Sequence, residues 1–309
     1  MYSRNGFSIR LVHPRYAVTW LGMLLLFCLV QMPYPWLIYI GSRLGRFSGL
    51  FLKRRVSIIK RNLELCFPDK NKAQINDMVV SNLSSLGIAL FETGIAWFWS
   101  DKRIRSLFSV TGSDNFINLN SRKQGVLIIG IHAMSLELGG RVMGLCFPVN
   151  AMYRPHNNKA MEYIQTRYRS RSGTGMIDRK NLRFMVSELK HGKAIWFAPD
   201  QDFGTKGTVF APFFSVENAS TSKGVATIAR LSQSPVLTVT MIRNPADNMK
   251  PYELIIGEEV KDFPCNSDQL DAKKLNRIIE TEIMRAPSQY LWAHRRFKTR
   301  PPGEESLYK

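Results

Sequence analysis

The part of the chain after Gly125 alternates short apolar runs with amphipathic segments, and this alternation limits the folds open to it. The apolar runs are 126–131, 151–153, 194–198, 236–242 and 252–256, and the helix-like segments are 136–145, 181–190 and 225–231. A last helical stretch ends before Pro287. Short buried strands that alternate with helices predict an α/β fold with a mixed, largely parallel sheet flanked by helices.

The N-terminal region carries an uncharged stretch, 17–40, that is long enough to cross a bilayer. Pro33 and Pro35 are expected to end its regular helix early, so both a crossing helix and a shallow insertion fit. More Lys and Arg residues follow the stretch than precede it, which predicts that the bulk of the chain faces the cytoplasm. A buried core helix is the alternative.

These features divide the chain into four parts. The predicted parts are a basic N-terminal segment (1–16), a membrane-inserted helix (17–40), a helical arm (41–124) and an α/β domain (125–309). We find no internal repeat and no low-complexity linker.

The composition limits the kinds of partner that the chain can bind. A hydrophobic content of 45% suffices for a globular core, and a formal net charge of +19 calls for an anionic partner such as a lipid surface, a phosphorylated substrate, an acidic protein or nucleic acid. The four cysteines lie far apart without a C-x-x-C pair, so neither a disulfide framework nor a zinc site is indicated. With an apolar N-terminal stretch present, anionic lipid explains the charge more simply than nucleic acid does.

The first candidate for chemistry is His132, which directly follows the apolar run 126–131. Glu137 stands five positions later, at the start of a predicted helix. On one continuous helix these side chains would diverge by about 140°. If His132 instead ends a strand, the chain can turn back and bring the carboxylate to the imidazole, as an oriented general base requires. A hydrogen-bonded loop histidine without a catalytic role is the plainer reading.

Other candidates also follow predicted strands, where an open α/β sheet usually places its site. Asp200 follows one strand and Arg154 another, while Arg169 ends a predicted helix and can reach an anionic group. Ser135 lies near His132 but has no strained elbow to expose it as a nucleophile. No metal-binding spacing and no cofactor motif is present in the sequence.

At the level of motifs, the chain resembles the late acyltransferases of lipid A biosynthesis, a branch of the membrane lysophospholipid-type acyltransferases. The H-x4-E spacing and the stretches NLELCFP, ETGIAWFW, HAMSLELGGRVMGLC, YRPHNN, WFAPDQD, RAPSQYLW and HRRFKTRP carry the resemblance. The wider group's F-P-E-G-T-R block is represented here only by FAPDQD, without its arginine.

The resemblance implies an enzyme of the bacterial inner membrane that works on the cytoplasmic face. It would transfer a fatty acyl group, palmitoleoyl first and lauroyl next, from acyl carrier protein to a hydroxyacyl chain of Kdo2-lipid IVA, a phosphorylated glycolipid. The residues suggest a mechanism that agrees with this. His132 would act as base with Glu137 as its orienting acid, and Arg169, Asp200 and Arg154 would bind substrate. A glycerophospholipid acyltransferase and a non-catalytic, membrane-anchored basic protein are the alternatives.

Overall fold

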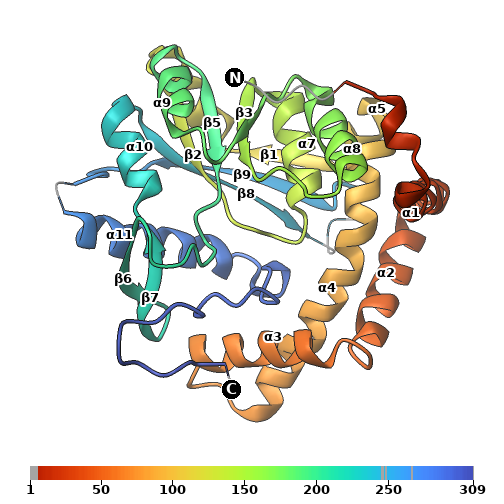
Figure 1. Cartoon of the computed structure of the whole chain (residues 1–309), viewed down its shortest axis with the longest axis horizontal. Coiled ribbons are helices and arrows are strands. Elements are labelled where there is room, and N and C mark those ends of the chain that lie inside the picture. The colour runs from red at the N-terminus through yellow and green to blue at the C-terminus, as the bar shows by residue number, and fades with distance from the viewer. Residues whose placement is uncertain (1–5, 245–246, 248, 266, 309) are drawn as a thin grey trace.

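A seven-stranded β-sheet forms the centre of the computed structural model, which describes residues 6–244, 247, 249–265 and 267–308 (Figure 1). The strands are β1 (Phe108–Thr111), β2 (Val126–Ile129), β3 (Val149–Tyr153), β4 (Met176–Asp178), β5 (Ala194–Phe197), β8 (Val236–Arg243) and β9 (Tyr252–Glu259). Their order is β1-β9-β8-β2-β5-β3-β4. The five strands from β8 to β4 run parallel, whereas β9 is antiparallel to β8 and parallel to β1. The prediction of a mixed, largely parallel sheet is confirmed.

Helices cover both faces of this sheet (Figure 1). They are α6 (Ser113–Ser121), α7 (Leu136–Cys146), α8 (Lys159–Arg169), α9 (Leu182–Lys190), α10 (Gly224–Ser232) and α11 (Asp268–Met284). Successive side chains of a strand point to opposite faces. Leu127 and Ile129 of β2 accordingly pack with α9, α10 and α11, while Val126 and Ile128 pack with α6, α7 and α8. The central strand is therefore buried on both faces, as its unbroken apolar sequence predicts.

Four strands were not predicted from the sequence. β1 lies within the range predicted as a helical arm, so the sheet begins before residue 125. β1 and β4 have four and three residues and include polar side chains, so neither forms an unbroken apolar run. The other two, β6 (Thr208–Phe213) and β7 (Val216–Ser222), form a separate antiparallel pair that packs against α11.

The uncharged N-terminal stretch forms parts of two helices rather than one. Two 3-10 turns, η1 (Ile9–Val12) and η2 (Pro14–Tyr16), lead into α1 (Ala17–Leu29), and α2 (Tyr34–Ser48) begins after Pro33. The prediction that the prolines end the first helix early is confirmed, and a single helix over 17–40 is wrong. Proline lacks the N–H that a continuing helix would need. Arg4 of the predicted basic segment lies outside the described residues.

The longest described helix is α4 (Lys72–Phe98), which follows α3 (Lys53–Cys66) and precedes α5 (Asp101–Arg105). In the described part of the chain, α4 alone is long and apolar enough to cross a membrane by length and composition, yet 56% of its apolar window is buried within the protein. α2 lies against it with backbone touching backbone. A Cβ on Gly45 would lie 2.0 Å from the Leu83 carbonyl oxygen, and one on Gly87 would lie 2.1 Å from the Gly41 carbonyl oxygen. Only glycine permits this approach.

α4 also carries a buried carboxylate that ties it to the sheet. Oε1 of Glu92 accepts hydrogen bonds from Nε of Arg243 at 3.0 Å and from the hydroxyl of Tyr252 at 2.7 Å. The Glu92 side chain is 1% exposed and that of Arg243 is 7% exposed. An ion pair this deeply buried is strongly destabilising to break, because either partner alone would be an uncompensated charge.

Candidate active site

His132 lies just beyond the carboxyl end of β2, and its imidazole is held by Asp200. Nδ1 of His132 is 2.7 Å from Oδ1 of Asp200, and the backbone N–H of His132 donates to Oδ2 of the same carboxylate at 3.0 Å. Asp200 is fully buried, whereas the His132 side chain is 29% exposed. Within the described part of the chain, Nε2 of His132 has no hydrogen-bond partner. The imidazole is thus fixed on one side and accessible on the other.

Strand pairing explains why these two residues meet. β2 and β5 are parallel neighbours in a register that places Ile129 opposite Phe197. Residues that follow the two strands therefore emerge side by side at the carboxyl edge of the sheet. The sequence placed both side chains at strand ends but assigned Asp200 to substrate binding rather than to the histidine.

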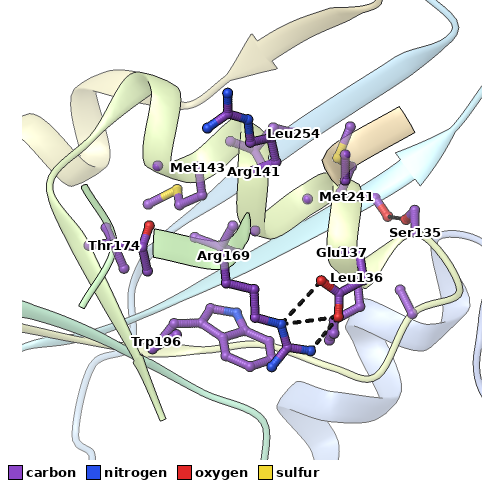
Figure 2. Close-up of a pocket in the computed structure, with 18 of the residues that line it drawn as sticks. Ser135, Leu136, Glu137, Arg141, Met143, Arg169, Thr174, Trp196, Met241 and Leu254 are labelled. Atoms are coloured by element: carbon purple, nitrogen blue, oxygen red, sulfur yellow. Dashed lines mark hydrogen bonds and ion pairs between the residues drawn. The ribbon is translucent and has the colours of Figure 1, made fainter. Parts of the chain in front are cut away.

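Glu137 does not contact the His132 imidazole, so the predicted His132–Glu137 contact is wrong. The carboxylate is bound by Arg169, whose Nε lies 3.1 Å from each oxygen and whose Nη2 also bonds Oε1 (Figure 2). Nε1 of Trp97 donates to Oε2 at 3.0 Å. The cause is that α7 begins at Leu136, so Glu137 projects from its first turn toward α8 and α4, and the chain does not double back over the histidine.

These contacts set the charge states of the site. Burial lowers the pKa of His132, but the adjacent Asp200 carboxylate outweighs it and raises that pKa above the usual 6.5. Burial raises the pKa of Asp200, yet its pairing with His132 leaves that pKa below the usual range. For Glu137, burial is likewise outweighed, and Arg169 keeps its pKa low. Both carboxylates are ionised near neutral pH.

Ser135 is a structural neighbour of the site, as the sequence indicated. Its buried hydroxyl donates to the Met241 carbonyl oxygen at 2.8 Å. It forms no side-chain cap on α7, although it occupies the N-cap position. The N–H of Leu136 donates to the Ala133 carbonyl oxygen at 3.1 Å, so the amides of Glu137 and Leu138 are the first on α7 that can serve a ligand.

An apolar cavity of about 110 Å³ opens beside Glu137 and Arg169 (Figure 2). Its wall includes Leu136, Met143, Val149, Met176, Trp196 and Leu254. Figure 2 shows Met143 and Thr174 at one end of it, and Glu137 and Ser135 at the other. A mostly apolar space with an arginine–carboxylate pair beside it suits a hydrocarbon chain that carries a polar reactive group.

The remaining sequence candidates are placed as follows. Arg154 follows β3 and is exposed, with no hydrogen-bond or ion-pair partner in the part of the chain that the structure describes. Tyr290, which the sequence reading did not single out, donates from its hydroxyl to the Asp200 carbonyl oxygen at 3.2 Å. Trp97, which is buried in the core, also supplies a polar contact to Glu137. Among the described residues, no three His, Cys, Asp or Glu side chains gather as a metal site requires.

Comparison with known proteins gives the family. The pattern of the bacterial lipid A biosynthesis acyltransferases matches residues 4–299. The chain belongs to this family. It is 53% identical over 308 residues to the lipid A biosynthesis palmitoleoyltransferase of Escherichia coli K12, with 100% of both chains covered. It is 43% identical over 302 residues to the lauroyltransferase of the same strain, with 98% of both covered, and 25% identical to the myristoyltransferase. The chain is thus an acyltransferase of lipid A biosynthesis.

The two carboxylates are expected to affect the pH dependence of the reaction differently. A neutral His132 base loses activity as the pH falls through its raised pKa, so the acidic limb of kcat/KM lies above 6.5. Asp200→Asn removes the charge that raises this pKa, so the limb shifts to lower pH while kcat falls by about 100-fold or more. Glu137→Gln shifts the limb less, because Glu137 does not touch the imidazole. Rate profiles between pH 5 and 9 measure both shifts. A larger shift for Glu137→Gln than for Asp200→Asn would contradict this assignment.

Proposed function

We propose that this acyltransferase moves a fatty acyl group from acyl carrier protein to the hydroxyl of a hydroxyacyl chain on Kdo2-lipid IVA, with palmitoleoyl as the preferred group. The observation that carries the proposal is the His132–Asp200 pair together with the apolar cavity, which Ile131 and Ala133 on either side of His132 help to line. The name of the 53% identical relative supports palmitoleoyl over lauroyl.

In the proposed mechanism, Nε2 of His132 takes the proton of the acceptor hydroxyl. Asp200 fixes the other ring nitrogen and stabilises the imidazolium that forms. The hydroxyl oxygen attacks the thioester carbonyl, the new C–O ester bond forms, and the C–S bond breaks. The proton then passes from the imidazolium to the leaving thiolate. No acyl-enzyme is needed, and the neighbouring Ser135 hydroxyl is engaged with a backbone carbonyl.

The negative charge that develops on the thioester oxygen during the attack must be stabilised by hydrogen-bond donors. The groups we assign to it are the Arg169 guanidinium, which Glu137 holds beside the cavity, and the backbone amides of Glu137 and Leu138 in the first turn of α7. Glu137 is then the residue that orients Arg169 rather than the histidine. Donors aimed at a developing oxyanion commonly contribute a factor of 10² to 10³ in rate.

The acceptor is anionic, and Arg154 is the cation best placed to bind it. Arg154 follows β3, which lies two strands from β2 in the sheet, so the guanidinium stands at the same edge as His132. A free, exposed guanidinium can bind a phosphate or carboxylate bidentately. The net charge of +19 also favours encounter with an acidic carrier protein and with anionic lipid.

We assign membrane contact to α1 and α2. Val18, Leu21 and Leu25 on α1 are 83%, 67% and 58% exposed, and Trp36 and Phe47 on α2 are 60% and 58% exposed. Lys53, Arg54 and Arg55 follow at the start of α3 and are exposed. Apolar side chains next to a run of cations suit the boundary of an anionic bilayer.

Replacing the proposed base tests the reaction. His132→Ala is expected to lower acyl transfer from acyl carrier protein thioester to Kdo2-lipid IVA by about 10³-fold or more, because the variant lacks the imidazole that takes the proton of the acceptor hydroxyl. Mass spectrometry of the product measures this. His191→Ala is the matched control, since His191 is exposed at the end of α9. Full activity in His132→Ala would refute the mechanism.

The cavity is expected to set the acyl chain length. A Cβ on Gly140 would have no atom within 4 Å, although Gly140 lines the cavity. Gly140→Leu should therefore fill acyl space and lower the preference for C16:1 over C12 by about 10-fold or more. Competition among C12, C14 and C16:1 donors, read by mass spectrometry, tests it. Gly22→Leu is the control, because that helical glycine is equally open and lies on α1.

Two results of the donor competition would count against the proposal. An unchanged donor ratio in an active Gly140→Leu variant would exclude this cavity as the acyl site. A dominant C12 product from the unaltered protein would overturn the palmitoleoyl preference.

The membrane assignment predicts weaker vesicle binding when α1 loses apolar surface. Leu21→Asp with Leu25→Asp should lower the partition coefficient on phosphatidylglycerol-containing vesicles by at least about 10-fold. Leu231→Asp with Leu270→Asp is the control, because these leucines are 57% and 59% exposed on α10 and α11. Vesicle sedimentation measures the coefficient, and equal losses in both double variants would refute the assignment.

A further inference from the structure

The loop that carries His132 is paired along its backbone with a distant segment, residues 287–294, which we call the strap. The strap begins with a short 3-10 helix, η4 (Pro287–Gln289), after α11. The N–H of Met134 donates to the Gln289 carbonyl oxygen at 2.7 Å, and the N–H of Leu291 donates to the His132 carbonyl oxygen at 3.1 Å. Between these bonds, Ala133 and Tyr290 form an isolated antiparallel bridge. The base is therefore held by main-chain bonds to the strap as well as by Asp200.

The side chain of Gln289 fixes the strap to the sheet. Its Oε1 accepts from the backbone N–H of Arg243 at 2.8 Å, and its Nε2 donates to the Arg243 carbonyl oxygen at 2.8 Å. Arg243 is the last residue of β8, and its guanidinium is held by the buried Glu92 of α4. The side-chain amide of Gln289 thus satisfies the backbone N–H and the carbonyl oxygen of Arg243, and Glu92 holds the guanidinium of the same residue.

Two buried asparagines hold the strap from the helical side. Nδ2 of Asn82 on α4 donates to the carbonyl oxygens of Ser288 and Tyr290, at 2.9 and 2.8 Å. Nδ2 of Asn62 on α3 donates to those of Trp292 and His294, both at 2.7 Å. These bonds fix the strap against the helices, whereas Gln289 alone gives it side-chain bonds to the end of β8 in the described part of the chain.

We propose that Gln289 is a positioning residue for the acyl transfer, an inference that rests on His132 being the base. Through Gln289 the strap locates the His132 backbone relative to the sheet, and Asp200 then sets the direction of the ring. Gln289 reaches His132 only through the backbone bond to Met134 and its neighbours. Small displacements of a reacting group can cost about 10²-fold in rate.

Gln289→Met tests the proposal because it keeps the length of the side chain and removes both bonds to Arg243. In the full chain, kcat is expected to fall by about 10-fold to 100-fold, with both KM values within about threefold of the original. The Nε2 and Nδ1 resonances of His132 should move in ¹⁵N-histidine NMR spectra, because the loop shifts relative to Asp200. Gln269→Met is the matched control: Gln269 is exposed and donates one bond to the Phe210 carbonyl oxygen.

A second variant keeps the test decisive if Gln289→Met does not fold. Gln289→Glu retains an acceptor for the Arg243 N–H but turns a second oxygen toward the Arg243 carbonyl, so it should also lower kcat. Its kcat relative to that of the unaltered protein at the same pH should recover partly as the pH falls and the carboxyl protonates. An unchanged kcat, a fall matched by Gln269→Met, or a fall expressed mainly in KM with unmoved His132 resonances would overturn the proposal. If His132→Ala is inactive while Gln289→Met is fully active, only this inference fails.

Discussion

The active site depends on the parallel pairing of β2 with β5. That pairing carries no catalytic group itself, but its register brings the residues beyond both strands to one point on the sheet edge. His132 and Asp200 meet there although 68 positions separate them in the chain. Because β2 is buried on both faces, a slip by one residue would turn its apolar side chains to the wrong layers. The hydrophobic core thereby fixes the position of His132, the base we propose.

α4 shows how an apolar helix contributes polar groups to a site from several of its turns. Asn82 holds the strap, Glu92 holds the end of β8, and Trp97 holds the carboxylate of Glu137. Each of these polar groups is buried in protein, where an unsatisfied donor or charge would be costly. This explains why a helix apolar enough to cross a membrane packs within the protein over more than half of its apolar window. The glycines at the contact between α4 and α2 let the two backbones approach closely, and this close packing keeps α4 in one position.

The sequence predicted much of the fold but only part of the site. The buried strands β2 and β8 and the one-sided helix α9 stood out, because complete burial and a helical period leave clear patterns. The short, partly polar strands β1 and β4 and the polar strand β7 leave none. His132 was singled out because it follows a buried strand. Its partner was misassigned because the order of strands in a sheet is a long-range property, and nearness in the chain favoured Glu137 over Asp200.

The two ion pairs of the site act on the histidine in opposite directions. Asp200 raises the pKa of His132, while burial and the charge of Arg169 lower it. Glu137 is hydrogen-bonded to this guanidinium, so the carboxylate lies directly against the charge of Arg169. The two carboxylates, Asp200 and Glu137, therefore have different roles. A carboxylate must bind the histidine to stabilise its protonated form during the reaction, and another must bind the arginine so that a cation can stand at the polar end of an apolar cavity. One acid could not do both, because the two cations approach from α8 and from the end of β2.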